Sequence, residues 1–228
     1  MNKDSIFSIP LPTIRRFPAY LRKLKDYQSH GDAWVSATKL ADDLRLKPIQ
    51  VRKDMACTGV EGKPKVGFEL AELIHAIEYH LGWDNTSDAI LIGAGHLGNA
   101  LIGYKGFENY GLRIVAIFDT DPKKIGTKTY DITIQAMDDL ESVIERFGIN
   151  IAVLTVPALY AQEIAQRLVA SDIKGIWNFA PKCLTLPEDV IVQRTDLATS
   201  FAELSSKLRT SIEIKKRNPV KKIKKHNL

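Results

Sequence analysis

The feature that most constrains the fold is a glycine-rich segment that directly follows an apolar run at residues 89–92. The segment consists of Gly93, Ala94, Gly95, His96, Leu97 and Gly98. In a strand–turn–helix unit the first glycine permits the tight turn, the second lets the backbone approach a pyrophosphate, and the third permits close helix–strand packing. A second apolar run, 112–118, ends in Asp119. The pattern predicts a βαβ unit with a phosphate-binding helix N-terminus.

The chain after this unit alternates between strand and helix patterns. Apolar runs that predict strands lie at 130–134, 151–155, 175–177 and 190–193, and helical patterns lie at 139–147 and 158–170. This alternation predicts an α/β fold with a doubly wound parallel sheet. We therefore assign residues 85–196 to a Rossmann-like dinucleotide-binding domain.

Asp119 is placed to bind the hydroxyls of an adenosine ribose, because it ends the second strand 21 positions after Gly98. A carboxylate there repels a ribose 2′-phosphate, and the neighbouring Thr120 and Asp121 supply no arginine that would accept one. The expected cofactor is therefore NAD(H). A glycine-rich turn without a ligand is the alternative interpretation.

No catalytic residue is expected. A dehydrogenase needs a second substrate and usually a proton donor or acceptor near the nicotinamide, but the nucleotide fold itself uses residues 86–207. No metal site is expected either, because Cys57 and Cys183 are too few and too far apart for a disulfide framework or a four-ligand zinc site. We expect both cysteines to be buried thiols.

Residues 1–84 predict a winged-helix domain. Helical patterns lie at 13–27, 37–44, 49–57 and 70–81, with Ser36 as an N-cap, Pro48 in the first turn of the third helix and Gly82 after the fourth. A short turn between the second and third helices is typical of helix-turn-helix proteins. Residues 59–68 contain three glycines and a proline, which favour a hairpin as the wing.

The charge is distributed in three blocks. Residues 1–67 carry 13 Lys and Arg against 7 Asp and Glu, residues 68–207 carry 11 against 19, and residues 208–228 carry 8 against 1. A basic N-terminal module is suited to neutralising phosphates, and an acidic middle argues against DNA contacts there. Residues 197–214 predict a helix with one apolar stripe, and 215–228 form a basic tail.

The side chains expected to contact double-stranded DNA lie in the third helix and the wing. They are Gln50, Arg52, Lys53, Lys63 and Lys65. Arginine and lysine bind guanine edges or phosphates, and glutamine binds adenine. An ordinary solvated helix face is the alternative. No apolar run approaches the roughly 18 residues of a membrane span, and no secretory signal begins the chain, so we expect no membrane partner and a cytoplasmic location.

Several separated stretches give the chain a resemblance to the Rex family of redox-sensing transcriptional repressors. They lie at 50–54, 93–101, 104–107, 118–126, 155–158, 175–181 and 195–197. The resemblance implies a homodimer that binds a palindromic operator and is released when NADH binds in place of NAD⁺. It also implies that the last helix, 197–214, swaps into the partner subunit.

The resemblance further implies roles for individual residues. Arg22, Tyr104 and Asp196 would form the switch that links the DNA-binding module to the nicotinamide state. The residues expected at the cofactor besides the glycine loop and Asp119 are Thr120, Asp121, Lys124, Thr155, Val156, Pro157, Asn178, Phe179, Ala180 and Pro181. The simpler interpretation is that Tyr104 is a core aromatic residue and Asp196 a helix N-cap.

The sequence departs from the family pattern in the DNA-reading segments. The recognition helix continues as residues 55–59 instead of Leu-Ser-Tyr-Phe-Gly, and residues 65–68 replace the usual Arg-Gly-x-Gly-Tyr of the wing. We therefore expect a diverged operator. The alternative functions are an NAD-dependent oxidoreductase and a CoA-binding or other nucleotide-binding Rossmann protein without DNA regulation.

Overall fold

The computed structural model describes residues 9–217, which form two compact units. The described residues up to Ser87, together with Lys105–Arg113, form the N-terminal unit, and Asp88–Tyr104, together with the residues from Ile114 on, form the second. The segment Lys105–Arg113 contains the 3₁₀ helix η1 (Lys105–Tyr110). The Trp83 and Tyr110 rings lie against each other, tilted by 40°, with their centroids 4.6 Å apart.

Besides η1, the described part of the N-terminal unit consists of four α-helices and a small sheet. The elements are α1 (Leu11–Ser29), β1 (Trp34–Val35), α2 (Ala37–Leu44), α3 (Pro48–Ala56), β2 (Phe68–Glu69) and α4 (Leu70–Leu81). The Ser36 side chain caps α2 by accepting a hydrogen bond from the Lys39 N–H, and Gly82 ends α4 in the left-handed conformation. Phe17, Val51 and Leu73 are completely buried where α1, α3 and α4 meet.

The wing is a tight turn closed by one pair of hydrogen bonds. The Lys63 N–H donates to the Gly67 carbonyl at 2.7 Å, and the Gly67 N–H donates to the Lys63 carbonyl at 2.9 Å. The expected hairpin therefore forms through this one bridge. The strand that follows it, β2, pairs antiparallel with β1. At the tip, Lys65 has a φ of +64°, in the left-handed region that non-glycine residues rarely adopt.

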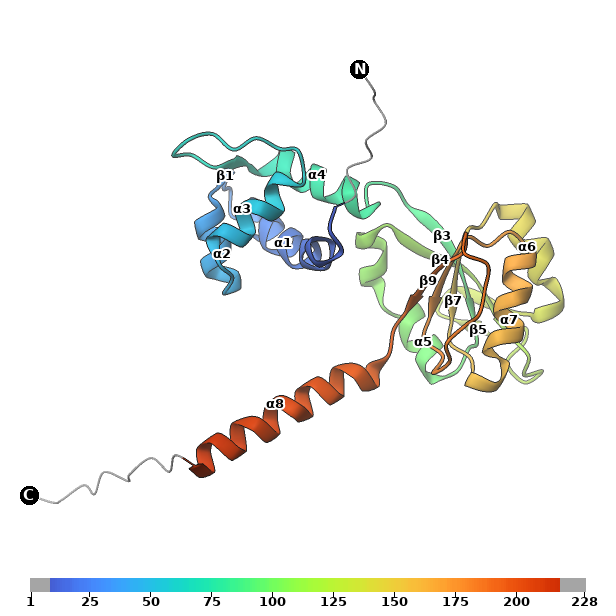
Figure 1. The fold of residues 1–228 in the computed structure, drawn as a ribbon. Helices are drawn as coiled ribbons and strands as arrows, with labels where there is room; N and C mark the ends of the chain where they lie inside the picture. The colour runs from blue at the N-terminus through green and yellow to red at the C-terminus, as the bar shows by residue number, and fades with distance from the viewer. Residues whose placement is uncertain (1–8, 218–228) are drawn as a thin grey trace, which may run out of the picture. The chain divides into compact units, whose positions relative to one another are not determined.

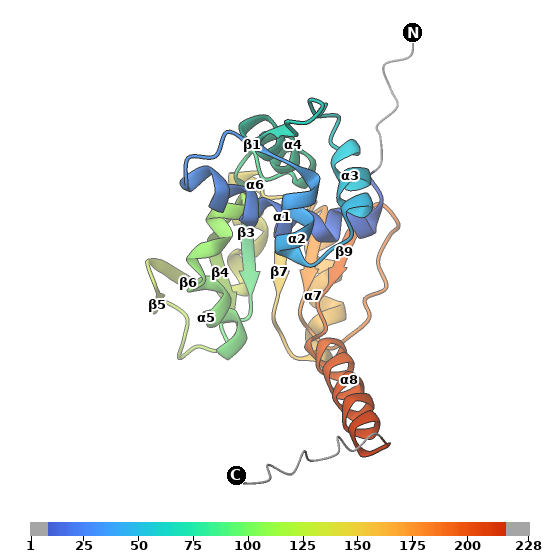
Figure 2. The same cartoon turned by 90° about the vertical axis from the view of Figure 1, so that its left-hand side faces the viewer.

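The second unit is built on a seven-stranded sheet in the order β5-β6-β4-β3-β7-β8-β9. The strands are β3 (Ser87–Ile92), β4 (Leu112–Asp119), β5 (Lys128–Thr129), β6 (Ile132–Ala136), β7 (Ile151–Leu154), β8 (Gly175–Asn178) and β9 (Ile191–Arg194). Without β5, this is the strand order of dinucleotide-binding folds. Figure 2 shows the strands side by side, with β5 at the edge beside β6.

Helices cover both faces of this sheet. They are α5 (His96–Ile102), α6 (Leu140–Phe147) and α7 (Ala158–Ala170), and the 3₁₀ helix η2 (Met137–Asp139) precedes α6. Figure 1 shows α6 and α7 on one face and α5 on the other. Each face has its own core, with Phe118 and Leu168 buried on the side of α6 and α7, and Leu91 and Ile117 buried on the other.

The last helix, α8 (Leu197–Arg217), presents an apolar stripe to solvent. Its large apolar side chains are between 44% and 69% exposed, namely Leu197, Phe201, Leu204, Leu208 and Ile212. The helix continues three residues beyond the expected end at residue 214. The rest of the predicted basic tail lies outside the described residues.

Two expectations differ from the structure. The strand expected at 130–134 is β6, which begins two residues later, at Ile132, because Tyr130 at a φ of +52° turns the chain. This turn joins β6 to the short strand β5, which pairs with it in the antiparallel direction. Cys183 is exposed and Cys57 half-buried, so the expectation of buried thiols is wrong for Cys183.

Candidate nucleotide site and nucleic-acid surface

The glycine loop connects β3 to α5, and each of its three glycines has different surroundings. Gly93 has a φ of +101°, and a Cβ on Gly98 would lie 2.1 Å from the Gly93 carbonyl oxygen, so helix and strand pack in direct backbone contact. Around Gly95, by contrast, a Cβ would meet no atom within 4 Å. The open space therefore lies over the glycine whose backbone is expected to face a pyrophosphate, at the N-terminus of α5.

Asp119 ends β4 and is held from three sides. Its Oδ2 accepts hydrogen bonds from the Ala94 N–H at 2.8 Å and from Lys124 Nζ at 2.9 Å, and its Oδ1 accepts one from the Asp121 N–H at 2.8 Å. Burial alone would raise the pKa of this carboxyl, but the three donors outweigh burial and keep its pKa below the usual value. The side chain is therefore an oriented carboxylate at neutral pH.

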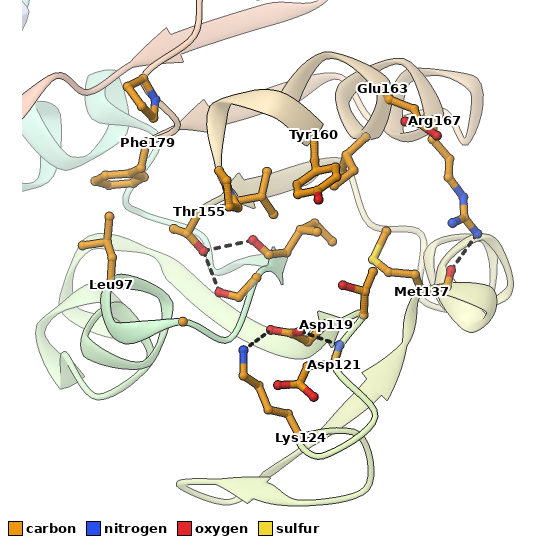
Figure 3. Close-up of a pocket in the computed structure, with 18 residues that line it drawn as sticks. Leu97, Asp119, Asp121, Lys124, Met137, Thr155, Tyr160, Glu163, Arg167 and Phe179 are labelled. Atoms are coloured by element: carbon orange, nitrogen blue, oxygen red, sulfur yellow. Dashed lines mark hydrogen bonds and ion pairs between the residues drawn. The ribbon is translucent and has the colours of Figure 1, made fainter.

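A cavity of about 890 Å³ extends from the glycine loop past Asp119. Figure 3 shows Asp119, Asp121 and Lys124 on one side of the cavity and Thr155, Tyr160 and Phe179 on the other. Twelve of the expected cofactor residues line it, namely Gly93, Gly95, Leu97, Asp119, Thr120, Asp121, Lys124, Thr155, Val156, Pro157, Phe179 and Pro181. They come from the carboxyl ends of β3, β4, β7 and β8, where open α/β sheets bind ligands.

Five expected cofactor residues do not line the cavity. They are Ala94, His96, Gly98, Asn178 and Ala180. Asn178 is almost completely buried, donates to the Lys182 carbonyl at 2.9 Å and accepts from the Ala180 N–H at 2.9 Å. Its side chain therefore shapes the loop that carries Phe179 and Pro181.

The cavity also has lining residues that the sequence did not indicate. They are Ile92, Met137, Tyr160, Glu163, Ile164 and Arg167. Arg167 on α7 pairs with Glu141 on α6 and donates to the Met137 carbonyl at 2.6 Å, which ties η2 to α7. Tyr160, Glu163, Ile164 and Arg167 lie three or four positions apart and therefore share one face of α7. Ile92 and Met137 are far from them in sequence, so spacing alone does not connect these two residues to that face.

The expected DNA-contacting residues lie on the surface of the N-terminal unit, with one exception. Arg52, Lys53, Lys63 and Lys65 are exposed. Lys63 Nζ lies 4.5 Å from the centroid of the Trp34 ring, a cation–π contact between the wing and β1. Gln50 is half-buried, and its Nε2 donates to Asp54 at 3.1 Å.

Asp54 is the centre of a buried polar cluster that the sequence did not reveal. Besides Gln50, it accepts hydrogen bonds from Thr13 at 2.9 Å, from Arg16 at 2.7 Å to each carboxylate oxygen, and from the Tyr20 hydroxyl at 2.6 Å. Burial acts to raise its pKa, but these donors keep the pKa below its usual value. The bonds join α1 to α3 and thereby fix the helix that carries Arg52 and Lys53.

The three expected switch residues lie in both units. Arg22 is exposed on α1 of the N-terminal unit, and Tyr104 is 51% exposed after α5. Asp196 caps α8, because its Oδ1 accepts from the Ala198 N–H at 3.0 Å, and its Oδ2 accepts from Arg194 at 2.9 Å. Asp196 is therefore the N-cap of α8, as the simpler interpretation expects. Tyr104 is too exposed to be a core aromatic residue.

Within residues 9–217 no three His, Cys, Asp or Glu side chains lie close enough together to hold a metal ion. Over the same residues no helix has the length and hydropathy needed to cross a bilayer.

Two family models match the chain. One, described as a CoA binding domain, covers residues 84–182, and the other, described as a putative DNA-binding protein N-terminus, covers residues 8–56. They coincide with the nucleotide site and with the helices that carry the basic surface.

Full-length relatives share both parts. The redox-sensing transcriptional repressor Rex of Treponema denticola is 45% identical over 199 residues, which is 87% of this chain and 95% of that protein. The repressor of the same name from Bacteroides fragilis is 38% identical over 91% of this chain and 94% of its own length.

Solved structures of RSP, a Rex-family repressor, are similar to more than nine-tenths of this chain. RSP in complex with β-NADH is 33% identical with a TM-score of 0.81, covering 92% of this chain and 99% of that chain. RSP in complex with β-NAD⁺ and operator DNA has a TM-score of 0.84, covering 93% of this chain and 98% of that chain.

Proposed function

The chain belongs to the Rex family of redox-sensing transcriptional repressors, and we propose that it represses genes by binding a palindromic operator and leaves the DNA when NADH replaces NAD⁺. As a member of this family it is a repressor and not an enzyme. A repressor of this kind acts on DNA in the cytoplasm, where the NADH/NAD⁺ ratio is sensed.

The observation that carries the proposal is the preformed nucleotide site. The open space at Gly95 and the oriented carboxylate of Asp119 fit a dinucleotide, with its pyrophosphate at the N-terminus of α5 and its adenosine ribose at Asp119. Thr155, Phe179 and Pro181 would line the nicotinamide end. Bound nicotinamide would supply the redox signal, while the residues of this chain bind and orient it.

A CoA ligand is the second candidate, because the matching family model is described as a CoA binding domain. The carboxylate of Asp119 argues against it. CoA carries a phosphate on its adenosine ribose, and a buried carboxylate at the ribose position repels phosphate.

We propose that Arg52 and Lys53 of α3 and Lys63 and Lys65 of the wing contact DNA. All four are exposed cations on one small unit. The hydrogen bond of Gln50 to Asp54 restricts the orientation of the Gln50 amide, so Gln50 contributes less than the neighbouring cations.

We propose that two copies associate through α8. Its apolar stripe, from Leu197 to Ile212, is exposed along the described helix, and such stripes mark interaction surfaces. The charged side chains of Asp196 and Arg22, with Tyr104, would then exchange partners as the nucleotide changes, which gives two discrete arrangements for the ligand to bias.

The test is fluorescence anisotropy of a labelled palindromic family operator at fixed salt, with parallel titrations of NADH, NAD⁺ and CoA. We expect binding in NAD⁺ and release by NADH alone. Release by CoA, or release by neither nicotinamide, would contradict the proposal. If the protein does not bind this operator, selection of its preferred DNA from a random pool decides whether it binds DNA at all.

Two sets of variants locate the surfaces. Arg52→Ala and Lys53→Ala are expected to weaken DNA binding at least tenfold while NADH affinity is kept. Phe201→Asp and Leu204→Asp are expected to shift the molar mass in light scattering from dimer to monomer. Unchanged DNA affinity, or an unchanged dimer, would exclude the corresponding surface.

A further inference from the structure

Lys124 places an ammonium group inside the nucleotide cavity, directly against the carboxylate that defines the cofactor. Its Nζ lies 2.9 Å from Asp119 Oδ2, and both residues line the cavity (Figure 3). The Lys124 side chain is 37% exposed and that of Asp119 is 10% exposed. The pair is therefore shielded from bulk water on the carboxylate side and open to a ligand on the lysine side.

The main chain holds Lys124 at this position. Its N–H donates to the Asp121 carbonyl at 2.9 Å, and its own carbonyl accepts bonds from the N–H and the hydroxyl of Thr127 at 2.9 and 2.6 Å. This turn directly follows β4. The backbone of Lys124 is therefore held in a hydrogen-bonded turn beside the cavity.

Counting hydrogen-bond capacity shows what the pair offers to a ligand. An ionised carboxylate has about four acceptor sites. Three sites on Asp119 are already used by Ala94, Asp121 and Lys124, which leaves about one. The ammonium has three donors, of which Asp119 takes one. The site therefore presents one acceptor and further donors side by side, which suits two neighbouring hydroxyls, one donating and one accepting.

We propose that Lys124 is a specificity-determining residue that sets how strongly the site discriminates against a ribose 2′-phosphate. This inference rests on the proposed NAD(H)-sensing function. Lys124 offsets the charge of Asp119, so the site excludes a phosphorylated ribose less strongly than an unpaired aspartate would. If the carboxylate is removed, the same ammonium becomes the group that attracts the phosphate.

The direct test compares Lys124→Met with Lys123→Met in the full-length protein. Lys123 is the matched control, because it carries the same charge one residue earlier, is exposed and does not line the cavity. Binding of NADH and NADPH is followed by nicotinamide fluorescence. We expect Lys124→Met to raise the preference for NADH over NADPH by about tenfold, and Lys123→Met to change it by less than about twofold.

A second pair of variants tests the reverse effect. Asp119→Asn is expected to improve NADPH binding relative to NADH by about tenfold, because Lys124 then lacks its counter-charge. The double variant with Lys124→Met is expected to lose this gain. If Lys124→Met changes the affinities for both nucleotides by the same factor, and the double variant behaves like Asp119→Asn alone, the inference is overturned.

The two possible failures are distinguishable. If the unmodified protein binds neither NADH nor NAD⁺, the proposed function itself fails. If it binds NADH and releases DNA, but the ratio of NADH to NADPH affinity does not respond to Lys124, only the role of Lys124 fails. Thermal unfolding of each variant without nucleotide identifies any loss that is merely structural.

Discussion

Asp54 in the N-terminal unit and Asp119 in the second unit are both buried aspartates whose pKa lies below its usual value, but they differ in what holds them. Asp54 receives its hydrogen bonds from side chains of α1 and α3. Asp119 receives two of its three from backbone N–H groups and the third from a lysine that lines the cavity. Asp54 is saturated and Asp119 keeps capacity for a ligand.

The contacts of a buried carboxylate indicate its role. When several side chains from different helices fill every acceptor site, the group fixes the packing of those helices. When the local backbone holds the carboxylate and one side remains on a cavity, the group is oriented for binding. Burial and a lowered pKa alone do not separate these two roles, because both aspartates have them.

The largest effect is expected from Asp54→Ala. This change leaves Arg16 and Tyr20 without their buried partner and should destabilise the N-terminal unit by about 3 kcal/mol. Urea unfolding followed by tryptophan fluorescence measures this loss, and DNA binding should disappear while NADH binding remains. Asp26→Ala removes an exposed aspartate of α1 as a control. Equal effects of the two variants would contradict a structural role for Asp54.

Gly98→Ala is expected to have the next largest effect. Its Cβ would collide with the backbone at Gly93, at a cost of about 2–3 kcal/mol of stability. Gly95→Ala meets open space, so it should leave the unfolding temperature nearly unchanged and lower NADH affinity instead. Thermal unfolding and nucleotide titration of both variants separate the two effects. A Gly95→Ala protein with normal NADH affinity would place the pyrophosphate elsewhere.

Acid should weaken both units. A carboxyl whose pKa is lowered by folding contributes stability at pH values above its unfolded pKa, about 3.9, and loses that contribution as the pH falls through the folded value. We therefore expect stability to decline below about pH 4. Asp54→Asn should show a weaker pH dependence in this range, measured by urea unfolding between pH 2.5 and 6. An unchanged pH dependence would mean that other carboxyls dominate.

The smallest effect on stability is expected from Arg194→Ala. Arg194 pairs with Asp196 on the exposed surface, and such pairs contribute below about 1 kcal/mol. If Asp196 takes part in the proposed switch, removing this competing partner should change the NADH concentration that releases DNA without changing the unfolding temperature. Anisotropy titrations measure this concentration. A changed unfolding temperature with normal release would assign Arg194 a structural role only.

Much of the fold was predictable where a local pattern carries the signal. The α7 helix has the expected bounds, Ser36 caps α2, and the three glycines with Asp119 lie as the dinucleotide pattern requires. Each of these features depends on spacing within one segment.

Other features depended on contacts that spacing does not encode. The partners of Asp54 lie 34 to 41 positions earlier on α1, apart from Gln50. Arg167 and Met137 approach each other only after α7 packs beside η2. Asn178 was expected at the cofactor, but its amide lies in the interior and holds the loop beside it. The turn at Tyr130 was missed because a bulky residue with positive φ is uncommon.

The placement of the nucleotide contacts at one edge of the sheet has an evolutionary consequence. All the strands that supply them do so at their carboxyl ends, while the loops at the opposite edge, such as residues 148–150 and 171–174, supply none. Selection for ligand binding therefore leaves that opposite edge free to drift. Homologous chains should accumulate insertions and sequence differences there first, while the ligand edge changes slowly.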